Sequence, residues 1–408
     1  MKNIVVQVFN WIDDRLPISK PWKDHMAEYY APKNFNIWYY FGSLALLVLV
    51  IQLASGLFLT MHFKPDATLA FSSVEHIMRD VQWGWLMRYM HSTGASAFFI
   101  VIYLHIFRGL IYGSYRSPRE LVWIIGMIIY VMLMAEAFMG YLQPWGQMSY
   151  WGAQVIISLF GAIPYIGTGL VEWIRGDFVV SDPTLNRFFA FHVFLVPILL
   201  LAMVVAHIIA LHEKGSNNPD GVEIKATKGK DGIPLDGIPF HPYYTVKDLW
   251  GYAIFLFIFA AIIFYSPQLG GWFLENDNFE PANPLKTPTE IKPLWYLTPF
   301  YSILRAVPDK LFGVIAMGGS LVVWFFLPWL DRSPVKSMRY KGIYSKIALA
   351  IFVISFFILG YLGTKPVSPE KTMIARICAV LYFSFFIFMP IYTKLDKTKP
   401  VPERVIYK

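Results

Sequence analysis

Four histidines lie deep within apolar stretches of the sequence: His91, His105, His192 and His207. An ionisable side chain in such a stretch is costly without a partner, which makes each of them a functional candidate. Fourteen residues separate His91 from His105, and in a helix this spacing covers roughly 21 Å in nearly whole turns. Both imidazoles therefore face one way, at two depths.

The second pair, His192 and His207, is fifteen residues apart. The extra residue adds a rotation of roughly 60°, which a tilt or a local unwinding of the helix can absorb. If the two helices run in the same direction, His91 is level with His192 and His105 with His207. Each level then offers two imidazoles that can clamp one haem iron, an outer and an inner one. An iron with both axial positions filled carries electrons and has no open site for a substrate.

Glycines indicate the same two levels. Gly42 and Gly56 are fourteen residues apart in one apolar stretch, and Gly126 and Gly140 are fourteen apart in another. A haem edge between helices needs a missing side chain at each level, although membrane glycines also serve close helix packing.

Two arginines lie three residues outside the first histidine pair. Arg88 precedes His91 and Arg108 follows His105, so each can reach the propionates of a haem at its own membrane face. The alternative is that both are interfacial arginines that snorkel toward water.

The elements that position these residues are membrane helices. Hydrophobic residues make up 56% of the chain and charged residues 15%, which favours a bilayer over water as the solvent. Eight apolar stretches are long enough to cross about 30 Å of hydrocarbon. They are 37–61, 87–111, 121–142, 188–211, 249–265, 311–330, 347–363 and 373–391. We therefore expect an all-α integral membrane protein with eight transmembrane helices, in which the first four form a haem-binding four-helix bundle.

The chain divides into five segments. An amphipathic N-terminal segment (1–36), without a cleavage site, precedes the bundle (37–212). A polar linker (213–248) leads to a C-terminal four-helix membrane domain (249–392) and a basic tail (393–408). Loops 143–187 and 266–310 contain apolar and aromatic segments that can fold back onto the membrane, as functional loops do.

Positive charge predicts the orientation. With eight spans, one face carries both termini and the linker, together with 23 of the 35 Lys and Arg residues. Such residues collect on the cytoplasmic side, so both termini are expected there and the basic tail is an orientation signal rather than a nucleic-acid patch. The lone Cys378 excludes a disulfide framework.

Five stretches of the chain resemble a known family. They are RYMHSTGASAFFIVIYLHIFRGL, GYLQPWGQMSYWGAQV, RFFAFHVFLVP, HEKGSNNPDG and PLWYLTPFYSILRAVPDK, in this order. Over essentially its whole length the chain resembles cytochrome b of the quinol:cytochrome c oxidoreductases (cytochrome bc complexes). The unsplit chain with eight spans is similar to the bacterial respiratory form, which implies a multi-pass protein of the bacterial cytoplasmic membrane.

The resemblance implies a cofactor set, an activity and partners. It implies two b haems with bis-histidine ligation, quinol oxidation at the outer face, quinone reduction at the inner face and a contribution to proton translocation. The implied partners are a Rieske-type iron–sulfur subunit, a c-type cytochrome subunit and a second copy in a homodimer.

The resemblance also implies two quinone sites. The outer quinol site would include Tyr141, Pro293, Tyr296 and Tyr301, although these aromatic side chains could serve packing alone. The inner site would consist of His212, Ser216, Lys247 and Asp248, and a histidine near a carboxylate suits proton delivery to a reduced quinone. The alternative for the inner residues is an ordinary charged interfacial cluster. Of the other histidines, we expect surface or interface positions for His25, His62, His76 and His241.

One departure from the family concerns the outer site. The family usually has Pro-Glu-Trp-Tyr, with the glutamate taking a quinol proton, whereas this chain has Leu294 between Pro293 and Trp295. Loop 266–310 holds Glu275, Glu280 and Glu290, and our hypothesis is that Glu275 takes the proton. The alternative is that all three are solvated and water accepts the proton.

A further carboxyl group, Glu136, lies within the third apolar stretch, four residues before Gly140. A membrane carboxyl group is a functional candidate, and this one should lie near the outer haem level. The alternative is a neutral acid that bonds to a neighbouring helix.

Two other functions compete with this interpretation. The chain could be the b-haem anchor of another quinone-linked oxidoreductase, but its two elaborate loops argue against that. It could also be a transporter with histidine proton carriers, which would leave the repeated fourteen-residue spacing unexplained.

Overall fold

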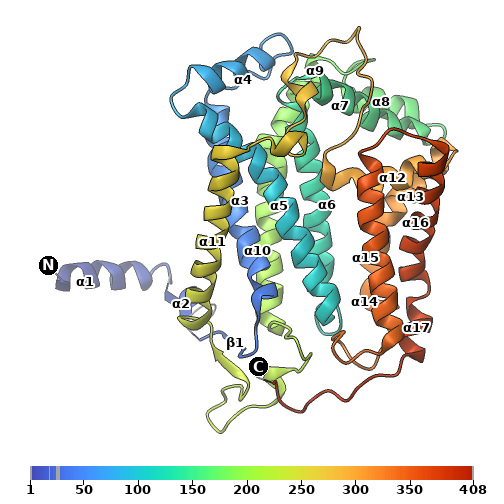
Figure 1. The fold of residues 1–408 in the computed structure, drawn as a ribbon. Coiled ribbons are helices and arrows are strands. Elements are labelled where there is room, and N and C mark those ends of the chain that lie inside the picture. The colour runs from blue at the N-terminus through green and yellow to red at the C-terminus, as the bar shows by residue number, and fades with distance from the viewer. Residues whose placement is uncertain (1, 18, 24–27, 407–408) are drawn as a thin grey trace.

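The computed structural model describes residues 2–17, 19–23 and 28–406. His25 and parts of the segments 1–36 and 393–408 lie outside the described residues. Long helices stand side by side and form the body of the molecule (Figure 1). On one side are α3 (Tyr40–Thr60), α5 (Gly84–Tyr112), α6 (Glu120–Leu142), α10 (Val196–Lys214) and α11 (Tyr243–Tyr265). Helices satisfy their backbone polar groups internally, which long apolar segments in a membrane require.

The second group of helices lies beside α6. It comprises α12 (Thr298–Ala306), α13 (Lys310–Val322), α14 (Leu327–Leu330), α15 (Ile343–Gly363), α16 (Pro369–Ile387) and α17 (Met389–Leu395). Their aromatic side chains share a core with α5 and α6. Trp123 of α6, for example, donates its indole N–H at 2.8 Å to the backbone O of Trp324, which lies in the short 3-10 turn Val323–Phe326 between α13 and α14.

Within the described residues, seven helices are long and apolar enough to cross a membrane. The eighth predicted span, 373–391, is instead a bent pair, because α16 and α17 meet at an angle of 59°. Pro390 at the start of α17 explains the break, since proline lacks an N–H and clashes with the carbonyl group one turn earlier. The prediction of eight spans therefore holds only if this pair counts as one.

Both long loops lie at the same end of the bundle, the upper end in Figure 1. The first contains α7 (Gln147–Leu159), α8 (Gly167–Arg175) and α9 (Asp182–Ala190), and α4 (Ala70–Arg79) lies beside them. The second loop packs against α7: Gln147 N donates to Glu280 O at 2.9 Å and Ser149 N to Asn278 Oδ1 at 2.8 Å. The loops therefore form one polar and aromatic layer over the helix ends.

The linker and the C-terminal tail meet at the opposite end. Strands β1 (Tyr30–Pro32) and β2 (Gly237–Pro239) pair antiparallel, a small sheet that the all-α prediction missed because its short Pro- and Gly-containing segments carry no strand pattern. Arg404 of the tail donates two hydrogen bonds to the carboxylate of Asp236 in the linker, from Nε at 2.6 Å and from Nη2 at 2.9 Å. The described start and end of the chain thus lie at one end of the bundle.

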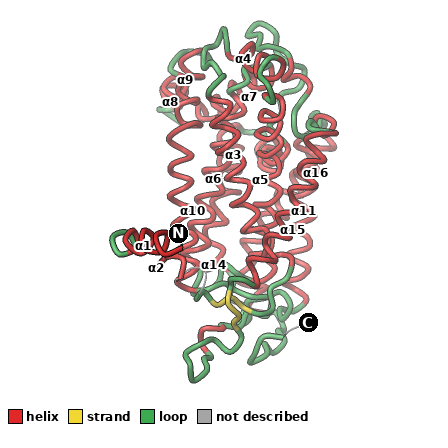
Figure 2. Tube along the Cα trace, turned by 90° about the vertical axis from the view of Figure 1, so that its left-hand side faces the viewer, coloured by secondary structure: helices red, strands yellow, loops and turns green. Residues whose placement is uncertain are grey.

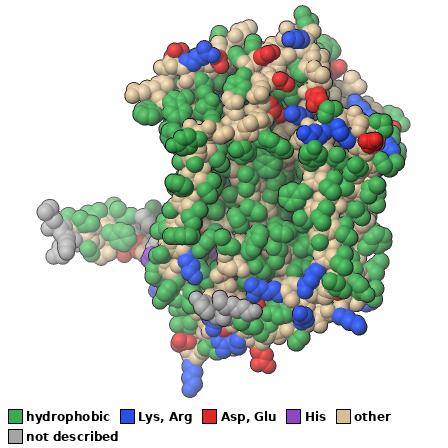
Figure 3. Space-filling view, viewed as in Figure 1, with side chains coloured by type: hydrophobic (Ala, Val, Ile, Leu, Met, Phe, Trp, Pro, Cys, Tyr) green, Lys and Arg blue, Asp and Glu red, His purple; other side chains and the backbone are tan. Residues whose placement is uncertain are grey.

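Two short helices, α1 (Lys2–Asp13) and α2 (Ser19–Trp22), precede the bundle, and α1 projects sideways from it in Figure 1 and toward the viewer in Figure 2. Most of the large apolar side chains of α1 are exposed, such as Phe9 and Trp11. Hydrophobic side chains also cover the middle of the face seen in Figure 3, and Lys and Arg side chains gather along its lower edge. This is the surface expected for a protein that crosses a bilayer.

Candidate functional site

The four intramembrane histidines form two facing pairs. The ring centroids of His91 and His192 are 6.0 Å apart with planes at 85°, and those of His105 and His207 are 6.4 Å apart at 64°. Two metal–imidazole bonds of about 2.0–2.1 Å, together with the ring radii, correspond to a centroid separation of about 6 Å. Each pair therefore has the spacing that one metal ion between two imidazoles requires.

Each of the four glycines faces one histidine. A Cβ atom at Gly56 would lie 3.1 Å from Cε1 of His91, and one at Gly140 would lie 2.4 Å from Cε1 of His192. At the other level, a Cβ atom at Gly42 would lie 3.2 Å from Cε1 of His105, and one at Gly126 would lie 3.1 Å from Cε1 of His207. The missing side chains thus give room to the imidazole rings themselves, with two glycines and two histidines at each level. The residues present fit a bis-histidine haem at both levels.

A wide helical turn absorbs the unequal histidine spacing. Residues Phe191–Leu195 form a π-helical turn that contains His192 and joins α9 to α10, and the N–H of Val196 bonds back five residues to Phe191 O. Pro197 follows and cannot donate to the carbonyl group of Val193, which favours a local departure from α-helix. This wide turn accommodates one extra residue, so the fifteen-residue spacing of His192 and His207 spans the same two levels as the fourteen-residue spacing of His91 and His105 in α5.

At the outer level, hydrogen bonds hold the second ring nitrogen of each histidine. Nδ1 of His91 lies 3.1 Å from Ser55 Oγ. Nδ1 of His192 lies 2.9 Å from Glu136 Oε1 and 3.1 Å from Glu136 O. With Nδ1 engaged in this way, Nε2 is the nitrogen available to a metal, which is the arrangement usual for metal-bound histidine.

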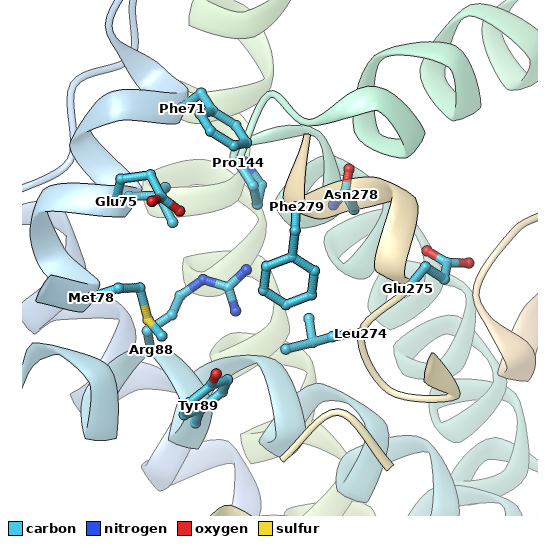
Figure 4. Close-up of a pocket in the computed structure, with 11 residues that line it drawn as sticks. Phe71, Glu75, Met78, Arg88, Tyr89, Pro144, Leu274, Glu275, Asn278 and Phe279 are labelled. Carbon is cyan, nitrogen blue, oxygen red and sulfur yellow. The ribbon is translucent and has the colours of Figure 1, made fainter. Parts of the chain in front are cut away.

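The two arginines lie in different surroundings. Arg88, near the start of α5, projects into a cavity of about 40 Å³ that Tyr89, Leu274 and Phe279 also line (Figure 4). Arg108 donates to Ser114 Oγ at 3.0 Å and lies over the ring of Tyr39 at 5.0 Å. Arg108 is therefore anchored to protein groups rather than extended toward solvent.

Glu275 is buried at the edge of the same cavity. Its side chain points away from Arg88 in Figure 4, and Oε2 accepts a hydrogen bond from the hydroxyl of Tyr141. Burial raises the pKa of Glu275 to about 7, although the Tyr141 hydrogen bond and the charge of Lys292 lower it and Asp277 raises it further. The group can therefore both hold and release a proton near neutral pH.

The other residues expected at the outer site divide into two groups. Tyr141 and Tyr296 interact with Glu275, and the ring of Tyr296 stacks on Phe99 at 3.8 Å. Tyr301 bonds instead to Ile291 O at 3.2 Å, under the guanidinium of Arg305. Pro293 is half-buried just before this group.

At the opposite end, Lys247 and Asp248 line a cavity of about 280 Å³. Its other lining residues are mostly aromatic: Phe35, Asn36, Ile37, Tyr39, Tyr40, Phe240, Tyr244 and Trp250. An aromatic cavity with a few polar groups suits a flat organic ligand.

His212 and Ser216 do not line this cavity and are linked by Tyr29 instead. The Tyr29 ring stacks on His212 at 4.3 Å, and its hydroxyl lies 3.0 Å from Ser216 Oγ. Tyr29 also belongs to an apolar cluster with Tyr244, one of the cavity residues. Sequence reasoning missed Tyr29 because no spacing or motif distinguishes it.

This fold and these pairs define a helical membrane protein with two facing histidine pairs in the core of its bundle. Residues 26–215 match the family model described as cytochrome b/b6/petB, and residues 281–383 match cytochrome b(C-terminal)/b6/petD. The chain belongs to the cytochrome b family.

Bacterial relatives are similar over almost the full length. "Cytochrome b" of Allochromatium vinosum is 62% identical over 97% of both chains, and that of Rickettsia prowazekii is 52% identical over 97% of this chain and 96% of the relative. A solved structure described as "Hyperthermophilic respiratory Complex III" matches with a TM-score of 0.87 and 40% identity, over 95% of this chain and 98% of that one. The family excludes the transporter alternative.

Proposed function

We propose that the chain is the cytochrome b subunit of a bacterial complex III-type quinol:cytochrome c oxidoreductase with two b haems in the bundle of α3, α5, α6 and α10. The observation that carries this proposal is the two facing histidine pairs, 6.0 and 6.4 Å apart, with a glycine against each ring. The matched relatives, described as cytochrome b and as part of a respiratory complex III, support it.

In this proposal the bundle residues hold and orient the haems. His91 and His192 ligate the outer iron, and His105 and His207 ligate the inner one. Arg88 and Arg108 neutralise the propionates, and Gly42, Gly56, Gly126 and Gly140 keep the imidazoles free of side-chain clashes. When bound, the haems supply one-electron transfer between the two depths.

At the outer face, Glu275 accepts a proton as quinol is oxidised. Its raised pKa and its burial beside Tyr141 and Tyr296 support this role. Pro293 and Tyr301 shape the neighbouring wall of the quinol site. One quinol electron leaves through a Rieske-type iron–sulfur subunit toward a c-type cytochrome, and the other crosses the bundle toward the inner face.

At the inner face, Lys247 and Asp248 bind quinone in the aromatic cavity and supply protons to the reduced product. His212 and Ser216 act from the other side of Tyr29, which links them to the cavity wall. Proton release outside and proton uptake inside contribute to proton translocation. An electron that crosses the whole membrane moves against about 2.3 kcal/mol per 100 mV, and the step between the two levels accounts for a part of this.

The chain works as a homodimer in the bacterial cytoplasmic membrane, with both termini in the cytoplasm. The linker, the described start and the described end of the chain share one end of the bundle, which supports this orientation. The Lys and Arg side chains along that end agree with it.

A reduced-minus-oxidised optical spectrum with pyridine haemochrome quantification tests the proposal. We expect two b haems per chain in the wild type and one in His207→Leu, because that variant removes a ligand of the inner haem alone. Fewer than two haems in the wild type, or an unchanged count in His207→Leu, would contradict the four-histidine assignment.

A further inference from the structure

The buried carboxyl group of Glu136 lies against the outer-level histidine His192. Glu136 Oε1 is 2.9 Å from Nδ1 of His192, and both side chains are less than one-fifth exposed. The backbone O of the same residue lies 3.1 Å from the same nitrogen, so α6 offers two acceptors to one N–H. Glu136 Oε2 is buried and has no hydrogen-bond partner among the described residues.

Helix α6 is shaped to bring this acceptor close. Glu136 and Gly140 are four residues apart, so they lie one above the other on the same face of the helix. A Cβ atom at Gly140 would lie 2.4 Å from His192 Cε1, a closer approach than at Gly42, Gly56 or Gly126. The absent side chain thus lets the imidazole approach α6, where the carboxylate reaches its Nδ1.

The two outer-level histidines therefore have unequal partners. His91 lies 3.1 Å from the hydroxyl group of Ser55, and His192 lies 2.9 Å from the carboxyl group of Glu136. Hydrogen bonds to an ionised acceptor are stronger than those between neutral groups, and a carboxylate at Nδ1 makes the imidazole a more basic ligand. A more basic ligand and a nearby negative charge both favour the oxidised iron over the reduced iron.

We propose that Glu136 is a positioning residue for His192 whose carboxylate lowers the reduction potential of the outer haem. This inference rests on the haem ligation proposed above. The carboxylate sets the tautomer and the orientation of the ring, so that Nε2 faces the iron, and it adds electron density to that ligand. It does not touch quinol or take part in the proton steps assigned to Glu275.

Redox titration of the purified complex tests this inference, with each b haem followed by its optical spectrum. We expect Glu136→Gln to keep two haems and to shift the reduced-to-oxidised ratio of the outer haem roughly tenfold toward the reduced form at a fixed potential, an upward shift of about 59 mV for a one-electron couple. The inner haem should keep its potential. Ser55→Ala, which removes a neutral partner from His91, is the matched control and should shift the outer potential less.

Glu136→Ala provides a second variant, since Glu136 O remains to hold Nδ1 when the side chain is removed. It should also raise the outer potential and leave the inner one unchanged. Unchanged potentials with two haems present, or loss of a haem in both variants, would overturn the inference, because the carboxylate would then be only a packing or folding element. A wild type with fewer than two haems would instead contradict the proposed ligation, so the two failures are distinguishable.

Discussion

Replacement of Glu275 by glutamine removes the proposed proton acceptor with little change in shape. Burial raises its pKa to about 7 from the ordinary value of 4.5, against the lowering effects of Tyr141 and Lys292. The carboxylate therefore holds a proton about 300-fold more tightly than an ordinary exposed glutamate does. General-base catalysis contributes about 10²–10⁴-fold to a rate, so we expect Glu275→Gln to lower quinol oxidation by about 100-fold.

The pH dependence gives a second readout. Only the ionised carboxylate accepts a proton, so wild-type turnover should rise with pH through about 7, and Glu275→Gln should lose this rise. The assay is steady-state cytochrome c reduction by the purified complex with a short-chain quinol. Glu280→Gln is the control, because this exposed residue in the same loop holds Gln147 through its backbone O alone. Unchanged turnover and an unchanged pH profile in Glu275→Gln would refute the reasoning and leave water as the acceptor.

Two further predictions concern the bundle and its inner end. Gly140→Ala would place a methyl group 2.4 Å from His192 Cε1, so we expect the haem content to fall from two to about one per chain. Gly169 has open space around it, so the control variant Gly169→Ala should keep both haems. Equal haem contents in the two variants would argue against the fit at the outer level. Lys341→Met removes a buried ammonium 2.5 Å from the buried Asp331, which keeps the Arg116 ion pair and the Tyr115 hydrogen bond. It should destabilise the chain by about 2 kcal/mol, measured as a lower thermal unfolding midpoint, while Lys346→Met at an exposed position should change this midpoint little.

The sequence predicted the helices well because a bilayer imposes one strong rule on long apolar segments. The separation of His91 and His105 by nearly whole turns also predicted two depths, and the structure brings His105 opposite His207. The bend before α17 was missed, although Pro390 was a visible signal for it. A hydropathy window averages over a single proline, whereas in the helix that proline breaks the backbone hydrogen-bond pattern.

Other features depended on tertiary placement. The fifteen-residue spacing left open whether a tilt or a local unwinding of the helix compensates for the extra residue, and the structure has a π-helical turn at Phe191–Leu195, which contains His192. The partner of Glu136 could not be assigned, since the sequence shows only that a carboxyl group lies in a span. Tyr29, which precedes the bundle, stacks on His212 in the last turn of α10, a contact between distant segments that no local pattern encodes.

Leu294 and Glu275 are both buried, but the side chains around them differ. Leu294 is 9% exposed and belongs to the apolar core that also contains Tyr296 and Phe300, so its side chain contributes packing there. Glu275 is similarly buried but has polar neighbours: the Tyr141 hydroxyl donates a hydrogen bond to it, and the charge of Lys292 lies nearby. A buried carboxyl group needs such partners to remain titratable near neutral pH instead of staying permanently protonated. Under the proposed function, Glu275 therefore restores a proton acceptor beside Tyr296 and leaves Leu294 free to stabilise the wall of the site.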